Sequence, residues 1–212
     1  MIKLTKAAML ATVAIAGASV LTTPAFAQSR GATASTAVGI ANLDQAVQQS
    51  AANATAIQQI QVTYAAQIAQ HQARATALQA ELQQLGAVVQ GEQARNPQNS
   101  TALQAAVQAF TTRRTSAQQE LGQILAPVEL AVAYVREQIT MRLTEALTAT
   151  ATARRLDVIL TQEAAVHVSP SADVTAAVVT ELNRLVPSVQ IVPPQGYQPG
   201  ALMRAAQAAA AA

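Results

Sequence analysis

An apolar repeat of seven residues runs through residues 53–148 and constrains this chain more than any other feature. In the first half of the stretch, two series of residues recur every seven positions and are offset by four. The first series is Ile57, Tyr64, His71, Leu78 and Leu85, and the second is Ile68, Ala75, Leu82 and Val89. This 4–3 alternation winds one stripe along a helix, as in the seam of a coiled coil. It therefore predicts a long amphipathic helix.

The second half of the stretch carries the same repeat and predicts a second long helix. One of its series is Leu103, Phe110, Ala117, Ile124 and Ala131, and the other is Val107, Arg114, Leu121, Val128 and Val135. Between the two halves, Pro97 cannot continue a helix and also disfavours helical backbone at Asn96. The helices are therefore expected to lie antiparallel, each extending about 60 Å at about 1.5 Å per residue. A hairpin of that length is a projecting arm or part of a bundle, and two helices packed only for stability remain an alternative.

The first 27 residues have the pattern of a cleavable export signal. Lys3 and Lys6 precede an apolar run over residues 7–21, and small residues at Ala25 and Ala27 fit cleavage after Ala27. The run is shorter than the roughly 20 residues that a membrane span needs. We therefore expect an exported protein that starts at Gln28 and has no transmembrane anchor, with an uncleaved anchor as the alternative.

Removal of that segment would leave an electrically balanced chain. The only two lysines lie in it, so 11 of the 13 basic residues remain, all arginines, against 11 acidic residues. No basic face with interleaved aromatic residues is present, which argues against nucleic-acid binding. The chain has no cysteine, which excludes disulfides and thiolate chemistry.

The regions that flank the repeat predict a small body of short strands and helices. We expect strands at residues 38–42, 156–160 and 164–168, the last two forming a hairpin, and an edge strand at residues 188–192. Asp44 and Asp173 are expected to cap two short helices. The strands come from opposite ends of the chain, so they can meet only if the long hairpin returns to its start. The predicted fold is α+β, with a small β body and a long projecting antiparallel helical hairpin.

The predicted domain organisation follows from these elements. Residues 1–27 are the signal peptide and residues 28–37 a mobile leader. Residues 38–192 form one domain, with its body at 38–52 and 153–192 and its helical arm at 53–152. Residues 193–212, rich in Pro, Gly and Ala, are expected to be a disordered tail. A body this small buries little surface by itself, which favours association of several copies.

Several segments resemble the Skp/OmpH family of periplasmic chaperones. They are Val38-Gly-Ile-Ala-Asn-Leu-Asp44-Gln-Ala-Val47, Arg155-Leu-Asp-Val-Ile-Leu160, Ala165-Val-His-Val168 and Ser171-Ala-Asp173-Val-Thr175. The position of Pro127 is also similar, and the resemblance covers about residues 38–186. It implies an ATP-independent holdase that binds unfolded outer-membrane proteins in a cavity formed by helical arms.

The resemblance also implies a homotrimer whose subunits join through a central β body. Six residues would belong to this oligomer body: Val38, Ile40, Val158, Leu160, Val166 and Val168. The seam of each arm would contain Ile57, Tyr64, Ile68, Leu78, Leu82, Leu85, Val107, Phe110, Leu121, Ile124 and Val128. Pro127 is a candidate hinge, because proline inside a helix removes a hydrogen bond. The chain departs from the family's usual basic arms, since it has no lysine after residue 6.

The sequence offers no constellation for catalysis, cofactor binding or metal binding. His71 and His167 lie on different predicted elements, and both are interpreted as structural residues. Glu81 and Arg114 are expected at matching heights of the hairpin, as a surface ion pair. We therefore do not expect an enzyme. The alternative to a chaperone is a structural envelope protein whose coiled-coil arms act as a spacer or bind a fixed partner.

Overall fold

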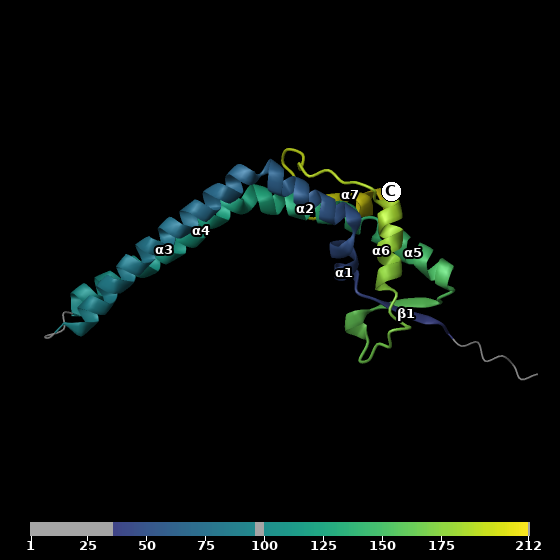
Figure 1. The fold of residues 1–212 in the computed structure, drawn as a ribbon, viewed down its shortest axis with the longest axis horizontal. Helices are drawn as coiled ribbons and strands as arrows, with labels where there is room; N and C mark the ends of the chain where they lie inside the picture. Colours follow the sequence, from purple (N-terminus) through teal and green to yellow (C-terminus); the bar gives the residue numbers. More distant parts are fainter. Residues whose placement is uncertain (1–35, 96–99, 212) are drawn as a thin grey trace, which may run out of the picture. The chain divides into compact units, whose positions relative to one another are not determined.

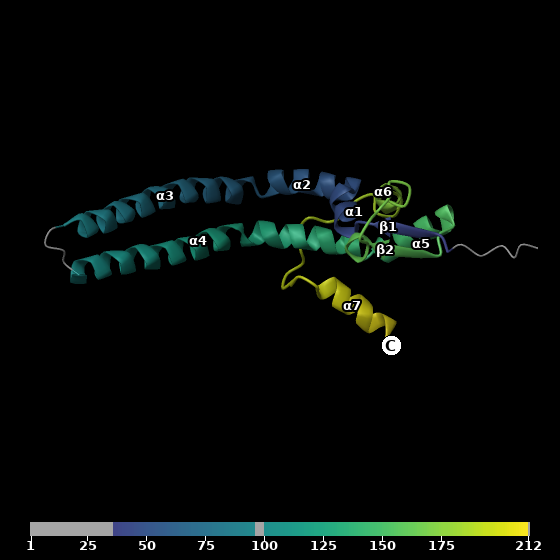
Figure 2. The same cartoon turned by 90° about the horizontal axis from the view of Figure 1, so that it is seen from below.

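The computed structural model describes residues 36–95 and 100–211, which belong to one contact unit. Figures 1 and 2 show a body of short elements from which two long helices run side by side. The elements are β1 (Val38–Ala41), α1 (Leu43–Gln49), α2 (Ala51–Thr63), α3 (Ala65–Ala94), α4 (Ser100–Thr140), α5 (Leu143–Arg154), β2 (Val158–Thr161), the 3₁₀ helix η1 (Gln162–Ala164), α6 (Thr175–Leu185) and α7 (Ala201–Ala210).

The long hairpin predicted from the seven-residue repeat is confirmed. Helices α2 and α3 form the outgoing half and α4 the return half, and α3 lies along α4 (Figure 2). The outgoing half is interrupted once, at Tyr64, whose φ of −105° and ψ of 21° lie outside the helical region. The predicted turn at Pro97 falls outside the described residues, as do the signal peptide and most of the leader. At the end of that leader, Ala37 already pairs with Asp157.

The body contains a two-stranded parallel sheet instead of the predicted hairpin. β1 pairs with β2 in the register Val38↔Val158 through Ala41↔Thr161. After β2 the chain enters η1 and does not fold back on β2, so the strand predicted at residues 164–168 is wrong. The chain reaches β1 instead on its other side, where Ile40 N–H donates to Ala172 O and Val174 N–H donates to Ile40 O, both at 2.8 Å.

The starts of the short helices differ from the prediction by one or two residues. Asn42, not Asp44, caps α1, because the Asn42 side chain accepts a hydrogen bond from Gln45 N at 2.9 Å. The N-cap of α6 is Val174, not Asp173. Asp173 lies one residue earlier, and its carboxylate accepts a hydrogen bond from Thr175 N at 2.8 Å. A hydrogen bond from the Thr175 side chain, together with this backbone bond, lowers the pKa of Asp173.

The hydrophobic core joins the body to the base of the arm. Helices α1, α2, α4, α5 and α6 and strand β1 all contribute to it. Its buried residues are Ala41, Ala46, Val47, Ala52, Ala56, Ile60, Ala131, Val135, Ile139, Leu143, Ala146, Val174, Val178, Leu182 and Val186. Because Ala56, Ile60 and Ala131 belong to this core, the arm predicted to begin at residue 53 becomes free of the body only near Tyr64.

The C-terminal segment is ordered, which corrects the predicted disordered tail. Residues 201–210 form α7, and Tyr197 is 8% exposed. Residues 188–192, predicted as an edge strand, form neither a strand nor a helix. Their backbone instead pairs with a side chain of α4, because Gln138 donates to Gln190 O at 2.8 Å and accepts from Gln190 N at 3.1 Å. Side-chain partners of this kind leave no periodic signal in the sequence.

Candidate interaction surface of the helical arm

The seam between α3 and α4 follows most of the predicted repeat. Leu78 is 2% exposed and Ala117 is 4% exposed, and both lie where the two helices face each other. All but one of the other predicted seam residues are partly buried. The partly buried ones are Ile57, Tyr64, Ile68, Leu82, Leu85, Phe110, Leu121, Ile124 and Val128. Two helices alone enclose few side chains, so most of this seam stays half open.

The exception is Val107, which is 42% exposed. Its predicted place in the seam is wrong, and so is that of Arg114, which is exposed. Ala106 and Arg113, one residue earlier, face the opposite helix instead. The true helical repeat of 3.6 residues drifts away from a strict seven-residue repeat, so an assignment by spacing alone slips by one position.

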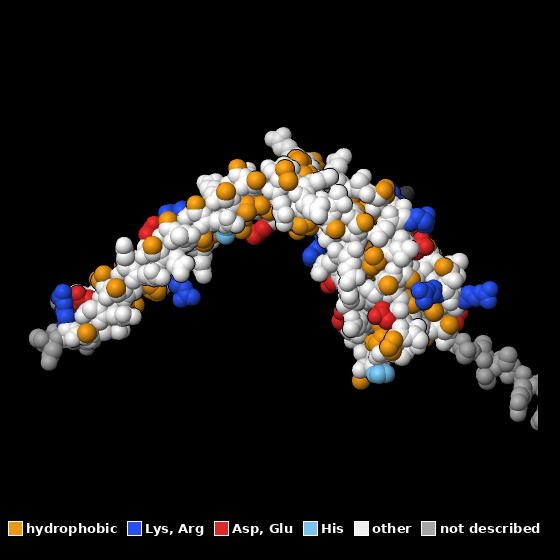
Figure 3. All heavy atoms as spheres, viewed as in Figure 1, with side chains coloured by type: hydrophobic (Ala, Val, Ile, Leu, Met, Phe, Trp, Pro, Cys, Tyr) orange, Lys and Arg blue, Asp and Glu red, His pale blue; other side chains and the backbone are white. Residues whose placement is uncertain are grey.

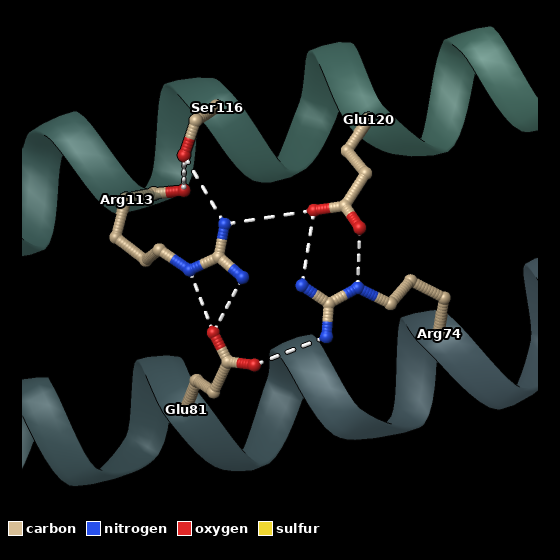
Figure 4. Close-up of polar contacts among 5 residues, drawn as sticks. All are labelled: Arg74, Glu81, Arg113, Ser116 and Glu120. Carbon is tan, nitrogen blue, oxygen red and sulfur yellow. Dashed lines mark hydrogen bonds and ion pairs between the residues drawn. The ribbon is translucent and has the colours of Figure 1, made fainter.

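Four charged side chains link the two helices at mid-arm (Figure 4). Arg74 on α3 forms a bidentate pair with Glu120 on α4 and also contacts Glu81 at 3.1 Å. Arg113 on α4 donates to Glu81 at 2.6 Å and lies 3.6 Å from Glu120. Glu81 therefore pairs with Arg113 and not with the predicted Arg114. Hydrogen bonds from Arg113 lower the pKa of Glu81, and those from Arg74 lower the pKa of Glu120.

This quartet also specifies how the helices align. On each helix an arginine and a glutamate are seven residues apart, and the antiparallel arrangement sets each arginine against the glutamate of the other helix. A slip of one seven-residue repeat would bring Arg74 against Arg113, or Glu81 against Glu120. Like charges facing each other disfavour both slipped registers, which an apolar repeat alone cannot distinguish.

A shallow groove of about 490 Å³ lies beside the seam at the same level. Its apolar lining comes from Leu78, Leu82, Phe110 and Leu121, together with small side chains at Ala75 and Ala117. Its polar lining is Gln79, Gln83, Gln118 and Arg114. Side-chain amides both donate and accept hydrogen bonds. The groove therefore offers an apolar floor with uncharged hydrogen-bonding groups and a single cation around it.

Further apolar side chains are exposed along the arm. Val62 is 79% exposed and Val88 is 52% exposed. The face of the arm seen in Figure 3 shows uncharged side chains over most of its length, with charged ones in small groups. An exposed surface of this composition can make many weak contacts with apolar and polar chains alike.

The candidate hinge at Pro127 lies inside α4, which continues across it. Arg74 faces Glu120 and Glu81 faces Arg113, so Pro127 comes close to the level of Tyr64 on the other half of the arm. One helix has a break at this level and the other lacks a backbone hydrogen bond. Both halves of the arm therefore depart from regular helix geometry or hydrogen bonding at this level.

The six residues predicted for an oligomer body lie in different surroundings. Ile40 is 9% exposed and packs inward, whereas Val38 and Val158 are each 41% exposed and Leu160 is 40% exposed. Val38 and Val158 are paired in register. Val168 is partly buried, and Val166 is fully exposed in the loop after η1. Among the described residues β2 pairs only with β1, so its outer edge is open.

The two histidines lie far apart in different parts of the molecule. His71 is partly buried in the seam and His167 is exposed on the body. Within residues 36–95 and 100–211, no three His, Cys, Asp or Glu side chains lie close enough to hold a metal ion. In the same part of the chain, no helix has the length and apolar character that a membrane span needs.

Comparisons with known proteins give a family match and a similar solved structure. The family profile described as "Outer membrane protein (OmpH-like)" matches residues 37–182. A solved structure from Caulobacter crescentus, described as OmpH-like and assigned as an outer membrane chaperone, is 20% identical. It has a TM-score of 0.47, and the alignment covers 76% of this chain and 92% of the other. No curated protein matches this sequence.

Proposed function

Because this chain belongs to the OmpH-like family of outer membrane proteins, we propose that it is a periplasmic, ATP-independent chaperone that holds unfolded outer-membrane proteins. Membership of the family supports a chaperone role. The holding mechanism, the clients and the periplasmic location are the finer parts of the proposal. The predicted export signal of residues 1–27 supports the location.

The half-open surface of the arm is the observation that carries the holdase proposal. A helix pair built only for rigidity needs no exposed Val62 or Val88 and no groove beside Leu82 and Phe110. An unfolded client presents apolar side chains and unpaired backbone amides. The groove provides an apolar floor and glutamine amides for these groups, and the arm's charges are largely paired with one another. Client capture would therefore depend on many weak, mostly uncharged contacts.

The open edge of β2 supports the proposal that the protein is a homotrimer. Unpaired strand edges bind further strands, and the exposed Val158 and Leu160 accompany this edge. Three copies joined through their sheets would direct three arms around one cavity. Val38, Ile40, Val158, Leu160, Val166 and Val168 remain the residues proposed for the oligomer body.

A spacer or fixed-partner module is the alternative function. The quartet of Arg74, Glu81, Arg113 and Glu120 favours it to the extent that it fixes the register of the arm. A fixed partner would cover the groove permanently, so unfolded clients would find no free surface. The two functions differ in whether an isolated protein suppresses aggregation.

The deciding experiment uses the chain from residue 28 onward. A urea-unfolded outer-membrane β-barrel protein is diluted with and without it, in the absence of ATP, and turbidity and mass by light scattering are recorded. We expect a trimer and suppressed aggregation near one trimer per client. A stable oligomer that leaves turbidity unchanged would favour the spacer.

A matched pair of variants locates the client surface. Val62→Gln and Val88→Gln remove exposed apolar side chains, and Gln72→Ala alters an exposed polar one. With contacts spread over the arm, each valine variant should weaken suppression by less than tenfold, and the double variant by more than either. A complete loss in one single variant would contradict spread-out contact.

A further inference from the structure

Residues 187–200 connect α6 to α7 and lie beyond the part of the chain that matches the family, residues 37–182. We refer to them as the strap. From α6 the strap passes along the base of the arm and crosses α4 before α7 begins (Figures 1 and 2). Family membership therefore does not explain why this segment is ordered.

A single buried carboxylate on α4 anchors the end of the strap. Glu137 is 6% exposed, and its carboxylate accepts a hydrogen bond from the Tyr197 hydroxyl. It also accepts from Gly200 N at 3.2 Å and from Met203 N at 2.8 Å, at the first turn of α7. The N-terminal end of a helix favours a negative charge, so α7 completes the surroundings of this carboxylate.

Two further contacts hold the strap along the same face of α4. The rings of Tyr134 and Tyr197 meet edge to face, with 4.9 Å between their centroids. Gln138 pairs with both backbone groups of Gln190. Tyr134, Glu137 and Gln138 are one turn apart or adjacent on the helix, so α4 presents one continuous strip to the strap.

The strap also reaches the outgoing half of the arm. Val189 and Ile191 pack on the hydrophobic core, and Ile191 shares a hollow with Thr55, Gln58 and Val62 of α2. A segment that starts in the body at α6 therefore touches both halves of the arm just before the break at Tyr64.

From these contacts we propose that the strap is a latch that sets the direction in which the arm leaves the body, with Glu137 as its anchoring residue. The core alone would keep α2 and α4 attached to the body. The latch adds a second attachment on the far side of α4, so that the base of the arm cannot pivot. Its release frees that pivot without dismantling the core, because the donors to Glu137 all come from residues 197–203.

The test measures the direction of the arm by the distance between two labels. The chain has no cysteine, so Gln48→Cys on α1 and Gln72→Cys on α3, both exposed, can carry spin labels cleanly. Labelled full-length mature chain is diluted with unlabelled chain, so that each oligomer carries one labelled copy. The distance distribution is then recorded with Glu137 intact, with Glu137→Ala, and with the control Gln198→Ala, which alters an exposed strap side chain.

We expect Glu137→Ala to broaden the distance distribution about twofold, as for a released hinge, while Gln198→Ala leaves it unchanged. Chymotryptic cleavage after Tyr197 should accelerate in Glu137→Ala, which reports release of the strap. Faster cleavage with an unchanged distribution would overturn the latch, and cleavage at the original rate would overturn Glu137 as the anchor. If Glu137→Ala loses its helical circular dichroism, Tyr197→Ala frees the strap with α4 intact and the same distance measurement decides.

A consequence for clients rests on the proposed holdase function. A released arm should hold a wider range of client sizes, measured as the largest unfolded protein whose aggregation is suppressed. The distance measurement contains no client, so its outcome separates failure of the latch from failure of the holdase.

Discussion

The body and the free arm are both largely helical, yet they are held together in different ways. In the body, six elements bury a common core that includes Ile139, Val178 and Leu182, all fully buried. In the arm beyond Tyr64, two helices bury little more than Leu78 and Ala117. The body's ion pairs, such as Arg142–Glu145, join residues of one helix three positions apart, whereas the arm's quartet joins two helices.

This difference indicates that the arm has low local stability and a defined alignment at the same time. Local opening is governed by the number of buried apolar contacts, which are few in the arm. The alignment of the two helices is governed by which charges face each other, and in the observed register each arginine of the quartet faces a glutamate of the other helix. An arm that opens easily but returns to one register suits the capture and release of clients under the proposed function.

The largest expected change in the free energy of unfolding comes from removing one buried leucine side chain, and it should differ between the body and the arm. Leu182→Ala should lower the free energy of unfolding of the whole domain by about 4 kcal/mol, because its site is enclosed on all sides. Leu78→Ala should lower it by about 2 kcal/mol, because the open seam can relax around the missing atoms. Chemical denaturation measures both, and amide hydrogen exchange should show faster opening of α3 alone in Leu78→Ala. Equal losses would remove the distinction between the two regions.

The next effect concerns Pro127, the candidate hinge. Pro127→Ala should restore one backbone hydrogen bond of α4 and stabilise the arm by up to about 3 kcal/mol. The arm should straighten and move less, measured by the distance between labels on either side of residue 127. The matched control is Ala126→Ser, at the exposed neighbouring position. An unchanged distance distribution and an unchanged range of clients would show that Pro127 is no hinge.

Replacing a glycine by alanine should change the stability of the protein in opposite directions in the body and in the arm. A Cβ added at Gly39 in β1 would lie 2.6 Å from Leu156 Cδ1 and 3.2 Å from a methyl group of Val174. Gly39→Ala should therefore cost about 2 kcal/mol through overpacking. Gly122 on α4 has no atom within 4 Å of such a Cβ, so Gly122→Ala should stabilise by about 0.5–1 kcal/mol. The melting temperatures of the two variants measure this. Shifts of the same sign in both variants would contradict the prediction.

The latch adds to the dependence of stability on acid pH that Glu81 and Glu120 already give the arm. Burial acts to raise the pKa of Glu137, but the hydrogen bonds from Tyr197, Met203 and Gly200 outweigh it and lower the pKa below its usual 4.5. Its contribution to stability is therefore complete above pH 4.5 and is lost as the pH falls through the lowered value. Loss of the anchor should cost about 2 kcal/mol.

The dependence of stability on alkaline pH follows from Tyr197, the hydrogen-bond partner of Glu137. Burial and the bond to Glu137 raise the pKa of Tyr197 from 10.0 to about 12, so this contribution is complete below pH 10 and is lost as the pH rises through about 12. The acid-side loss of stability should become smaller in Glu137→Gln, with the part due to Glu81, Glu120 and Asp173 remaining, and the alkaline loss should disappear in Tyr197→Phe. An acid-side loss of unchanged size in Glu137→Gln and an alkaline loss of unchanged size in Tyr197→Phe would assign both to other groups.

The smallest effect concerns the quartet. Arg74→Gln should lower the melting temperature by about 2 °C or less, because the partners are partly exposed and screened by salt. The difference from the unchanged protein should vanish in 1 M salt. Arg142→Gln, which breaks a pair within α5, is the control with no change in alignment. In Arg74→Gln alone, crosslinks between α3 and α4 should form in more than one register. Crosslinks confined to the original register would show that the quartet does not specify the alignment.

The periodicity of the sequence was sufficient to predict the arm and most of its contents. Leu78, Leu82, Phe110 and Leu121 fell on the correct face because helical spacing is set by the backbone itself. Val107 and Arg114 did not, because the drift between 3.6 and 3.5 residues per turn accumulates along a helix. The groove beside the seam was not predicted, because its lining combines side chains of two helices far apart in the sequence.

Local spacing in the sequence was sufficient to predict the two antiparallel helices of the arm and the short strands near β1 and β2. Three features became visible only in the folded chain: the parallel pairing of β1 with β2, the position of Asp173 beside β1, and the packing of residues 187–210 against α4. These depend on single partners more than 50 residues apart, such as Glu137 and Tyr197. A hydrogen bond between distant side chains repeats with no period, so only the folded chain reveals it.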